Sequence, residues 1–583
     1  KEPHPLCDNL KYIAGDYCRF VKAEKGGLDI CYLLYIKALE QWHLSEYTHK
    51  KVDAVYAYLN RKTVMDDLIR ERVLEVNEDG CLTNKKIQNI PQENVFVRFT
   101  VQSASPDVTD ECWRDPTLWD SFIEYSRSLE KEQELDYLTG TKEAPSYLHS
   151  RKIRNEGDGA KLISSNDEAN FTFRGRFLTK EQAQSIGIEA SQKIHNALKW
   201  IIRKQGYDYD TMVIVAWESN MLQMPLWSSS TEQIVSAYAQ EQAESENEDN
   251  LFEDIALDIE PETPEEEITD TNVVTASDFI SALQGYRRRL YHTSKMVLLA
   301  VDAATPGRLA LVECKTLDSS RYLKNIELWH SQCEWLHTKR SHKKIKSYYG
   351  MTGVRETIEI LYGSEGAGDL LTMSDASRKK LYKNMGQMLL SCIWDRSKIP
   401  YSFVTAAVNR ASSPQSYKDR YNWERVLSLA CSLVKKYRYD YVDKKEEWKV
   451  ALDENCRIRS YLYGRLLAVA DRMEYRTYDK DKDSGRITNA KRYMSTFSQR
   501  PFETWKIIEE NLGPYRGKLG IKERHYYDNL IDKISALFDV EAFSDNTKLD
   551  GLYLLGFHSQ SFDMKKMKTE ISAQGAEEEE SNE

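Results

Sequence analysis

The chain has 583 residues, of which 41% are hydrophobic and 11% aromatic, and its formal net charge is −11. This length is sufficient for two or three domains with large buried cores, and the lack of a long apolar run argues against a membrane span. Ten cysteines are scattered between Cys7 and Cys456 without a CxxC pair, a pattern typical of a reduced intracellular protein. We therefore expect a cytoplasmic protein with no membrane partner, no cofactor and no structural metal.

The acidic residues are concentrated in two segments. Glu241–Asp270 contains 14 acidic residues and no Lys or Arg, and Glu577–Glu583 contains five acidic residues and no basic one. Such like-charged segments are too polar to pack, and we expect them to be solvated. A second interpretation is that they compete with nucleic acid for basic surfaces. The rest of the chain is net positive, so the overall negative charge does not exclude a nucleic-acid partner.

The first part of the chain mixes predicted helices with one predicted strand. Apolar and Tyr positions within Pro5–Leu68 are typical of helices. Alternating apolar residues predict a strand over Glu93–Val101. The apolar stripe of Pro116–Leu129 predicts a helix.

The stretch Lys161–Phe177 is dense in small polar and amide side chains flanked by cations, and alternating Phe residues within it predict a half-buried strand. The following segment, Glu189–Gly206, has the periodicity of an amphipathic helix with a basic face. Amides can bind base edges and cations can bind phosphates. The candidate DNA-binding residues are Lys161, Ser164, Ser165, Asn166, Asn170, Arg174, Arg176 and Lys193. The alternative interpretation is a loop, an edge strand and a helix whose basic face is merely solvated.

Further strands are predicted over Asp210–Trp217 and Lys295–Asp302, the latter paired with Arg308–Cys314, and a helix is predicted over Ser320–His337. From Arg378 onward the pattern is almost wholly helical. The predicted helices are Lys380–Ile393, Tyr401–Arg410, Trp423–Tyr437, Ser460–Tyr475, Pro501–Glu510, His525–Leu537 and Leu549–His558. We therefore predict an α+β fold: an N-terminal domain with antiparallel strands over residues 1–377 that carries the acidic insert 241–270, a helical bundle over 378–570 and an acidic tail over 571–583.

The predicted bundle contains a basic segment. Between Asn455 and Asn529 there are 16 Lys or Arg residues and ten acidic residues, interleaved with aromatic side chains. A groove with cations and aromatic rings could bind single-stranded DNA by phosphate contacts and base stacking. The candidate residues for this contact are Arg465, Arg472, Arg486, Lys491, Arg492 and Arg500. The alternative is a solvated bundle surface.

The chain contains no Walker loop, GxGxxG fingerprint, HExxH motif or Ser nucleophile elbow. One predicted strand ends at Asp302, and the next ends with Glu313 and Lys315. Many nucleases use this pattern of residues to bind Mg²⁺ and position water. A magnesium-dependent nuclease is therefore the alternative function. The cluster His330, Cys333, His337 and His342 lacks the paired spacing of structural zinc sites, and we expect it to lie on a partly buried helix.

Five blocks of the sequence resemble the large subunit of the type I-C CRISPR Cascade complex, in the order of that family and over nearly the whole chain. They are KLISSND with FTFRGRF and SQKIHNALKW from Lys161 to Trp200, VDAATPGRLALV at Val301–Val312, IPYSFVTAAVNRASSP at Ile399–Pro414, ALDENCRIRSYLYGRLLAV at Ala451–Val469 and LYLLGFHSQ at Leu552–Gln560.

The resemblance implies a subunit that is not an enzyme. Its N-terminal domain is expected to recognise the protospacer-adjacent motif in duplex DNA and to help open the strands. Its helical bundle, which is similar to the small subunit, is expected to hold the displaced strand and help recruit the helicase–nuclease. The implied partners are the crRNA-bound Cascade backbone and crRNA-end subunits, small subunits, target double-stranded DNA and the helicase–nuclease. The family would also place a strand-rich segment ahead of His4, and Val450 is a candidate internal start for a small subunit.

Overall fold

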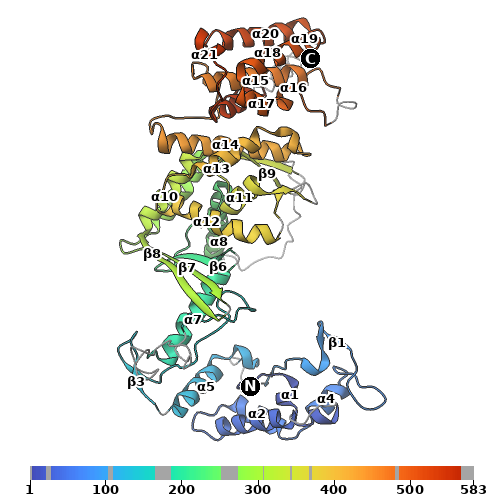
Figure 1. Ribbon diagram of the computed structural model, residues 1–583. Coiled ribbons are helices and arrows are strands. Elements are labelled where there is room, and N and C mark those ends of the chain that lie inside the picture. The colour runs from blue at the N-terminus through green and yellow to red at the C-terminus, as the bar shows by residue number, and fades with distance from the viewer. Residues whose placement is uncertain are drawn as a thin grey trace. The chain divides into compact units, whose positions relative to one another are not determined.

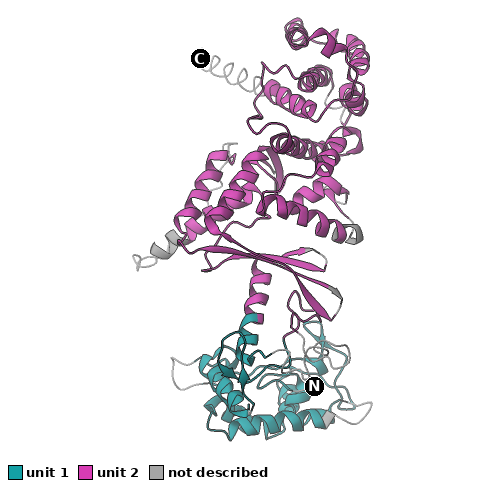
Figure 2. Ribbon diagram, turned by 60° about the vertical axis from the view of Figure 1, so that its left-hand side comes forward, with its two compact units in different colours: residues 1–149, 164–194 teal, residues 150–163, 195–583 magenta. Residues whose placement is uncertain are grey.

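A computed structural model of the protein describes residues 3–21, 28–102, 109–130, 132–163, 185–209, 211–250, 273–305, 307–341, 344–366, 371–373, 375–479 and 485–565. Its contacts divide the chain into two compact units (Figure 2). The first unit comprises Lys1–His149 with Ser164–Ile194, and the second comprises Ser150–Ile163 with His195–Glu583.

The first unit consists of short helices around one apolar core, to which Tyr35, Leu39 and Trp42 contribute. The described α-helices that lie wholly within it are α1 (Leu10–Ile13), α2 (Leu28–His43), α3 (Lys50–Leu59), α4 (Val64–Arg70) and α5 (Pro116–Leu129). Its described residues also form two small antiparallel pairs, β1 (Lys86–Ile87) with β2 (Ile90–Pro91) and β3 (Glu134–Leu135) with β4 (Lys142–Glu143).

Helix α5 has the bounds that the sequence predicts, and its first turn explains why. Asp115 is the N-cap and accepts a hydrogen bond from the backbone N–H of Thr117 at 3.0 Å, while Pro116 occupies the first helical position. The Asp115 carboxylate also forms a buried ion pair with Lys51 of α3 at 2.5 Å. Burial raises the pKa of Asp115, but the hydrogen bond from Lys51 and those from Thr117 outweigh it and hold the pKa at about 2.

The strand predicted over Glu93–Val101 is wrong. Burial alternates along Val95–Val101, as the pattern indicates, but the chain makes only isolated bridges there, between Phe96 and Asn9 and between Thr100 and Glu111. The segment is extended backbone packed against the core without a continuous partner strand, because alternation reports which side chains are buried and not whether a ladder forms.

The second unit is organised on a four-stranded antiparallel sheet in the order β5 (Tyr207–Tyr209), β6 (Met212–Glu218), β7 (Lys295–Thr305) and β8 (Arg308–Asp318). The predicted pairing of the last two strands is confirmed, with Leu298 opposite Lys315. One face of the sheet, including Val213 and Val301, packs with Ile201 of α7 (Ile188–Gln205). This contact confirms the predicted amphipathic helix.

The opposite face of the sheet belongs to the large core, where Ile214 and Leu298 are buried. Helices of the second unit lie on this side of the sheet (Figure 1). These helices are α8 (Thr231–Asn250), α9 (Ala276–Arg288), α10 (Ser319–Gln332), α11 (Val354–Tyr362), α12 (Asp375–Trp394), α13 (Tyr401–Ala411) and α14 (Arg420–Tyr441). The strands β11 (Ser364–Glu365) and β12 (Leu371–Thr372) form a short pair.

The helix predicted over Ser320–His337 ends earlier than expected. Helix α10 stops at Gln332, with Cys333 as its C-cap, and the chain turns into β9 (Trp335–Ser341), which pairs with β10 (Lys344–Gly350). Trp335 and His337 are buried on one side of this hairpin. A spacing of two places them on one face of a strand, whereas the prediction had assigned them to a helix.

The C-terminal part is a bundle around α15 (Arg459–Tyr475), which is buried on nearly every side. The other helices are α16 (Asn489–Arg492), α17 (Met494–Gln499), α18 (Pro501–Asn511), α19 (Gly513–Arg516), α20 (Ile521–Ser535), α21 (Val540–Ser544) and a final helix over residues 552–565. Gly464 permits the final helix to cross α15 closely, because a Cβ at this position would overlap the carbonyl oxygen of Tyr553.

The fold is α+β, as predicted, with antiparallel strands before a helical C-terminal part. The predicted C-terminal helices are confirmed as α12, α13, α14, α15, α18, α20 and the helix at residues 552–565. The two compact units are a different division of the chain from the predicted domains 1–377 and 378–570, and the boundary at residue 377 falls within α12. The predicted domains and their functions stay predictions.

Candidate nucleic-acid interface

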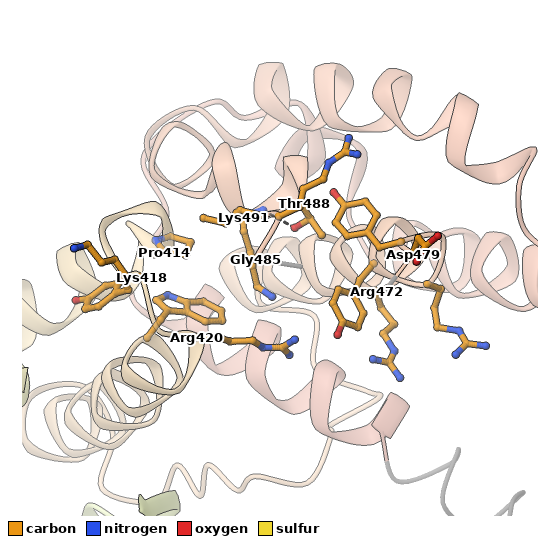
Figure 3. Close-up of a pocket in the computed structure, with 15 residues that line it drawn as sticks. Pro414, Lys418, Arg420, Arg472, Asp479, Gly485, Thr488 and Lys491 are labelled. Carbon is orange, nitrogen blue, oxygen red and sulfur yellow. Dashed lines mark hydrogen bonds between the residues drawn. The ribbon is translucent and has the colours of Figure 1, made fainter. Parts of the chain in front are cut away.

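A cleft of about 630 Å³ opens in the second unit between the start of α14 and the end of α15 (Figure 3). Its walls are Pro414–Trp423, the last turn of α15 with the residues that follow it, and Gly485–Lys491. Among the described residues, six cations and one carboxylate line it: Lys418, Arg420, Arg472, Arg476, Arg486 and Lys491, with Asp479. This excess of positive charge in a concave site favours an anionic ligand.

Helix ends position the cations of the cleft. Asp419 caps α14 by accepting a hydrogen bond from the backbone N–H of Tyr421 at 2.9 Å, so Arg420 stands at the first position of that helix. On the opposite wall, Arg472 lies in the last turn of α15. Figure 3 shows Arg420 and Arg472 approaching the same part of the cleft from these two helices.

Two carboxylates of α15 fix the wall that contains α16. Buried Glu474 accepts hydrogen bonds from the Tyr478 hydroxyl at 2.6 Å and from the backbone N–H of Asn489 at 2.7 Å. Asp471 accepts from the Thr488 hydroxyl at 2.5 Å and pairs with Lys491 at 3.0 Å. Burial, and then the Glu474 carboxylate, raise the pKa of Tyr478 well above its ordinary value, so the phenol stays protonated as a donor.

Some of these cations are already paired. Arg420 pairs with Glu424 at 2.9 Å, and the Arg476 Nε donates to Glu523 at 3.2 Å. Within the described ranges, no carboxylate lies within ion-pair distance of Lys418 or Arg472. Arg472 makes a side-chain hydrogen bond to Tyr527, and neither charge is neutralised by a described carboxylate.

Aromatic rings lie beside the cations of the cleft. The guanidinium carbons of Arg420 and Arg472 are 5.2 and 6.0 Å from the ring centroid of Tyr475. Arg486 lies 4.8 Å from the ring centroid of Tyr478. The cleft thus combines groups that bind phosphates with groups that stack on bases, which is the chemistry of single-stranded nucleic-acid sites.

The family model for CRISPR-associated protein (Cas_Csd1) matches residues 1–565. The chain belongs to this family. No curated protein matches it in sequence. Membership confirms the resemblance drawn from the five sequence blocks, and it makes the protein a CRISPR-associated subunit of a Cascade complex of type I-C.

The cleft of this Cas_Csd1-family chain gathers three of the six cations predicted to contact a displaced strand, namely Arg472, Arg486 and Lys491. Arg492 and Arg500 are exposed but do not line it. Arg465 is only 4% exposed, and its Nε donates to Gln560 at 3.0 Å. Burial lowers the pKa of Arg465, and the side chain holds α15 to the final helix and does not face the cleft.

Sequence reasoning missed one pair of residues, Lys418 and Arg420, and a second pair, Tyr475 and Tyr478, as members of the site. It also did not include Arg476 among the candidates. The run Arg472–Tyr478, RMEYRTY, alternates cations and tyrosines at a predicted helix end and could have indicated the second pair. No local pattern indicates the first pair, because Lys418 and Arg420 reach the cleft only through the packing of α14 near α15.

Two of the eight predicted motif-binding residues lie in the described ranges. Lys161 is half-buried, and its backbone pairs with β8 at Arg308; burial, and then Arg151, lower the pKa of its ammonium. Lys193 is exposed and pairs with Glu189 at 2.5 Å. The remaining six residues, Ser164, Ser165, Asn166, Asn170, Arg174 and Arg176, lie outside the described residues.

The alternative nuclease site finds no support in the family or in the geometry. Asp302 accepts a hydrogen bond from Lys383 at 2.6 Å, and Lys315 pairs with Glu313 at 2.5 Å and with Asp395 at 2.7 Å. Each carboxylate is therefore held by a lysine. Among the residues that the structure describes, no group of three or more His, Cys, Asp or Glu side chains is placed to bind a metal ion.

The two described histidines of the cluster lie in the core and have hydroxyl partners. A ring nitrogen of His330 lies 2.8 Å from the Thr231 hydroxyl, and one of His337 lies 3.0 Å from the Ser432 hydroxyl. Burial lowers the pKa of both imidazoles to about 3, so they are neutral core residues. His342 lies outside the described residues.

None of the described helices is both long and apolar enough to span a bilayer.

Proposed function

We propose that this chain is the non-catalytic large subunit of a type I-C RNA-guided surveillance complex and that its cleft holds the DNA strand displaced by guide pairing. The observation that carries this proposal is the cleft between α14 and α15, with its six cations and its aromatic rings. A displaced strand presents phosphates and unpaired bases, and this cleft offers partners for both.

We further propose that the stretch Lys161–Phe177 recognises the protospacer-adjacent motif in duplex DNA and assists strand opening and R-loop formation. Its support is the density of amides and cations in the sequence, together with membership of the Cas_Csd1 family. Exposed Lys193, in the helix that follows, is suited to a phosphate contact. In this division of labour, guide pairing reads the target sequence and the protein reads only the short motif and the backbone.

The proposed partners are those of a Cascade subunit: the crRNA-bound backbone and crRNA-end subunits, the small subunits, target double-stranded DNA, and the helicase–nuclease that degrades it. Family membership supports the assembly as a whole. Recruitment of the helicase–nuclease is proposed from the family resemblance alone.

The chain is proposed not to cleave DNA itself. Support comes from Asp302 and Glu313, because each carboxylate is bound to a lysine ammonium. The lysine offsets the negative charge that would attract a divalent cation. Incubating the purified chain with Mg²⁺ and DNA, with Glu313→Ala beside it, tests this directly. Cleavage by the wild type that is lost in the variant would contradict the proposal.

Equilibrium binding of a labelled single-stranded oligonucleotide to the full chain, measured across a series of salt concentrations, tests the cleft. The variant is Arg472→Ala/Arg486→Ala. The control is Lys522→Ala/Lys533→Ala, which removes the same charge from exposed positions of α20 that do not line the cleft. Each phosphate contact with a single strand contributes about 0.7 to the slope of log K against log salt.

The cleft variant should therefore bind more weakly, and its slope should fall by about 1.4 if both cations contact phosphates. The control should keep the wild-type slope. Equal affinities and equal slopes for the two double variants would show that the cleft is not where DNA binds.

A further inference from the structure

The aromatic residues that line the cleft differ in whether a ring face is open. Trp423 is 4% exposed, and its indole N–H donates to the carbonyl of Ala411 at 2.9 Å. Tyr417 is half-buried with Arg410 against its ring, 5.7 Å from the centroid. Trp423 is therefore closed to a nucleobase, and Tyr417 is less exposed than Tyr475.

Tyr478 is also committed within the protein. Its hydroxyl donates to Glu474, Arg486 lies over its ring at 4.8 Å, and Tyr515 meets that ring edge-on at 6.4 Å. It is a structural part of the wall that contains α16. Removing its ring would disturb that wall as well as any ligand contact.

Tyr475 is different, because 42% of it is exposed. It closes the last turn of α15, and it lines both the main cleft and a smaller adjoining cavity of about 120 Å³. The ring therefore stands at the junction of two open spaces. Tyr478 is tilted 56° away from it with a centroid separation of 6.2 Å, so the two rings are not stacked on each other.

Cations flank the Tyr475 ring on the two helices that form the junction. Arg420 comes from α14 and Arg472 from α15, with guanidinium carbons 5.2 and 6.0 Å from the ring centroid. Arg420 and Arg472 both line the smaller cavity as well as the main cleft. A nucleotide whose base lies on the ring would have its phosphates within the field of both guanidinium groups.

We propose that Tyr475 is the base-stacking residue of the cleft and that it restricts the cleft to strands with unpaired bases. This inference rests on the proposed function of the cleft and adds its selectivity. In a duplex, both faces of each base are covered by its neighbours, so no ring can stack on them without unstacking the helix. The cations of the cleft alone would attract any polyanion, whereas a ring beside them selects a polyanion that carries free bases.

The test compares two labelled oligonucleotides with equal numbers of phosphates, an oligothymidine and its fully abasic counterpart, at one salt concentration. The full chain, Tyr475→Ala and Tyr475→Phe are each titrated. Stacking contributes on the order of 1–3 kcal/mol per base, which is at least about a fivefold difference in affinity. Wild type and Tyr475→Phe should therefore prefer the oligothymidine at least about fivefold.

Tyr475→Ala should lose this preference and bind the abasic strand as wild type does. Two results would overturn the inference: Tyr475→Ala keeping the preference, or weakening both ligands equally, which would indicate a structural role. The Arg472→Ala/Arg486→Ala variant separates the two proposals. If it loses both ligands while Tyr475→Ala keeps the preference, the cleft binds DNA but Tyr475 is not its stacking residue. If it binds both ligands as wild type does, the cleft itself is wrongly assigned.

Discussion

The buried ion pair between Lys51 and Asp115 joins α3 to the start of α5, and replacing Lys51 by Met should destabilise this part of the first unit. The two side chains are 4% and 3% exposed, and the two charged groups lie 2.5 Å apart. Removing one partner of a buried pair leaves an uncompensated charge and typically costs about 3–5 kcal/mol. Amide hydrogen exchange of α5 in the full chain should therefore become at least about 100-fold faster.

The pH dependence of the same exchange measures independently how much ionised Asp115 stabilises the fold. The pKa of Asp115 is lowered from 3.8 to about 2 in the folded state, so ionised Asp115 favours folding by about 2 kcal/mol. Because the folded pKa lies below the unfolded one, this stabilisation is present above about pH 4 and is lost as the pH falls toward 2. Protection of α5 should fall over that interval in the wild type and fall less in Lys51→Met.

The control for this prediction is the double variant Lys51→Met/Asp115→Asn. It removes both charges but keeps a side-chain oxygen that can accept the hydrogen bond from Thr117 at the N-cap. It should recover most of the protection lost in the single variant, since an uncharged pair leaves no buried ion. Wild-type exchange in Lys51→Met, or equal loss in the double variant, would refute the assigned role of the ion pair.

Three further predictions concern the C-terminal bundle and the sheet. Gly464→Ala should lower the free energy of unfolding by about 2 kcal/mol or more, because the new Cβ would overlap the Tyr553 carbonyl. Gly513 has open space around it, so Gly513→Ala should have little effect. Chemical denaturation of the two variants compares these free energies. Arg465→Ala should destabilise the bundle by about 2 kcal/mol through the lost bond to Gln560, yet leave the salt dependence of single-strand binding unchanged, since Arg465 does not line the cleft. Lys383→Met should raise the pKa of Asp302, because the hydrogen bond from Lys383 lowers this pKa while burial raises it. NMR titration of the Asp302 carboxyl in the wild type and the variant measures the direction of the pKa change. An unchanged pKa would contradict the assigned contact.

Local signals in the sequence predicted much of the fold. Helix α5 begins and ends at its predicted residues because Asp115 and Pro116 specify its start and one apolar stripe specifies its buried face. The β7–β8 pairing follows from two apolar runs around a turn. The strand predicted from the period-two pattern over Glu93–Val101 is wrong, because burial of alternate side chains does not require a partner strand. The sequence predicts a helix through Trp335 and His337, whereas α10 ends at Gln332 and both residues lie in β9.

The candidate site was predicted in part. Arg472, Arg486 and Lys491 lie within one predicted basic segment and do meet in the cleft. Charge alone could not separate them from Arg465, which has the same side chain on the buried side of α15. Arg420 lies far from that segment in sequence, and only the packing of α14 near α15 brings it to the Tyr475 ring.

Photocrosslinking within an R-loop formed by the assembled complex tests directly whether the cleft holds the displaced strand. The displaced strand carries 4-thiothymidine at successive positions, and mass spectrometry identifies the crosslinked peptides of this chain. We expect crosslinks to the walls of the cleft, Pro414–Trp423, Arg472–Asp479 and Gly485–Lys491, that weaken in Arg472→Ala/Arg486→Ala. Strong crosslinks elsewhere on the chain, with none to these three segments, would contradict the claim that the cleft holds the displaced strand.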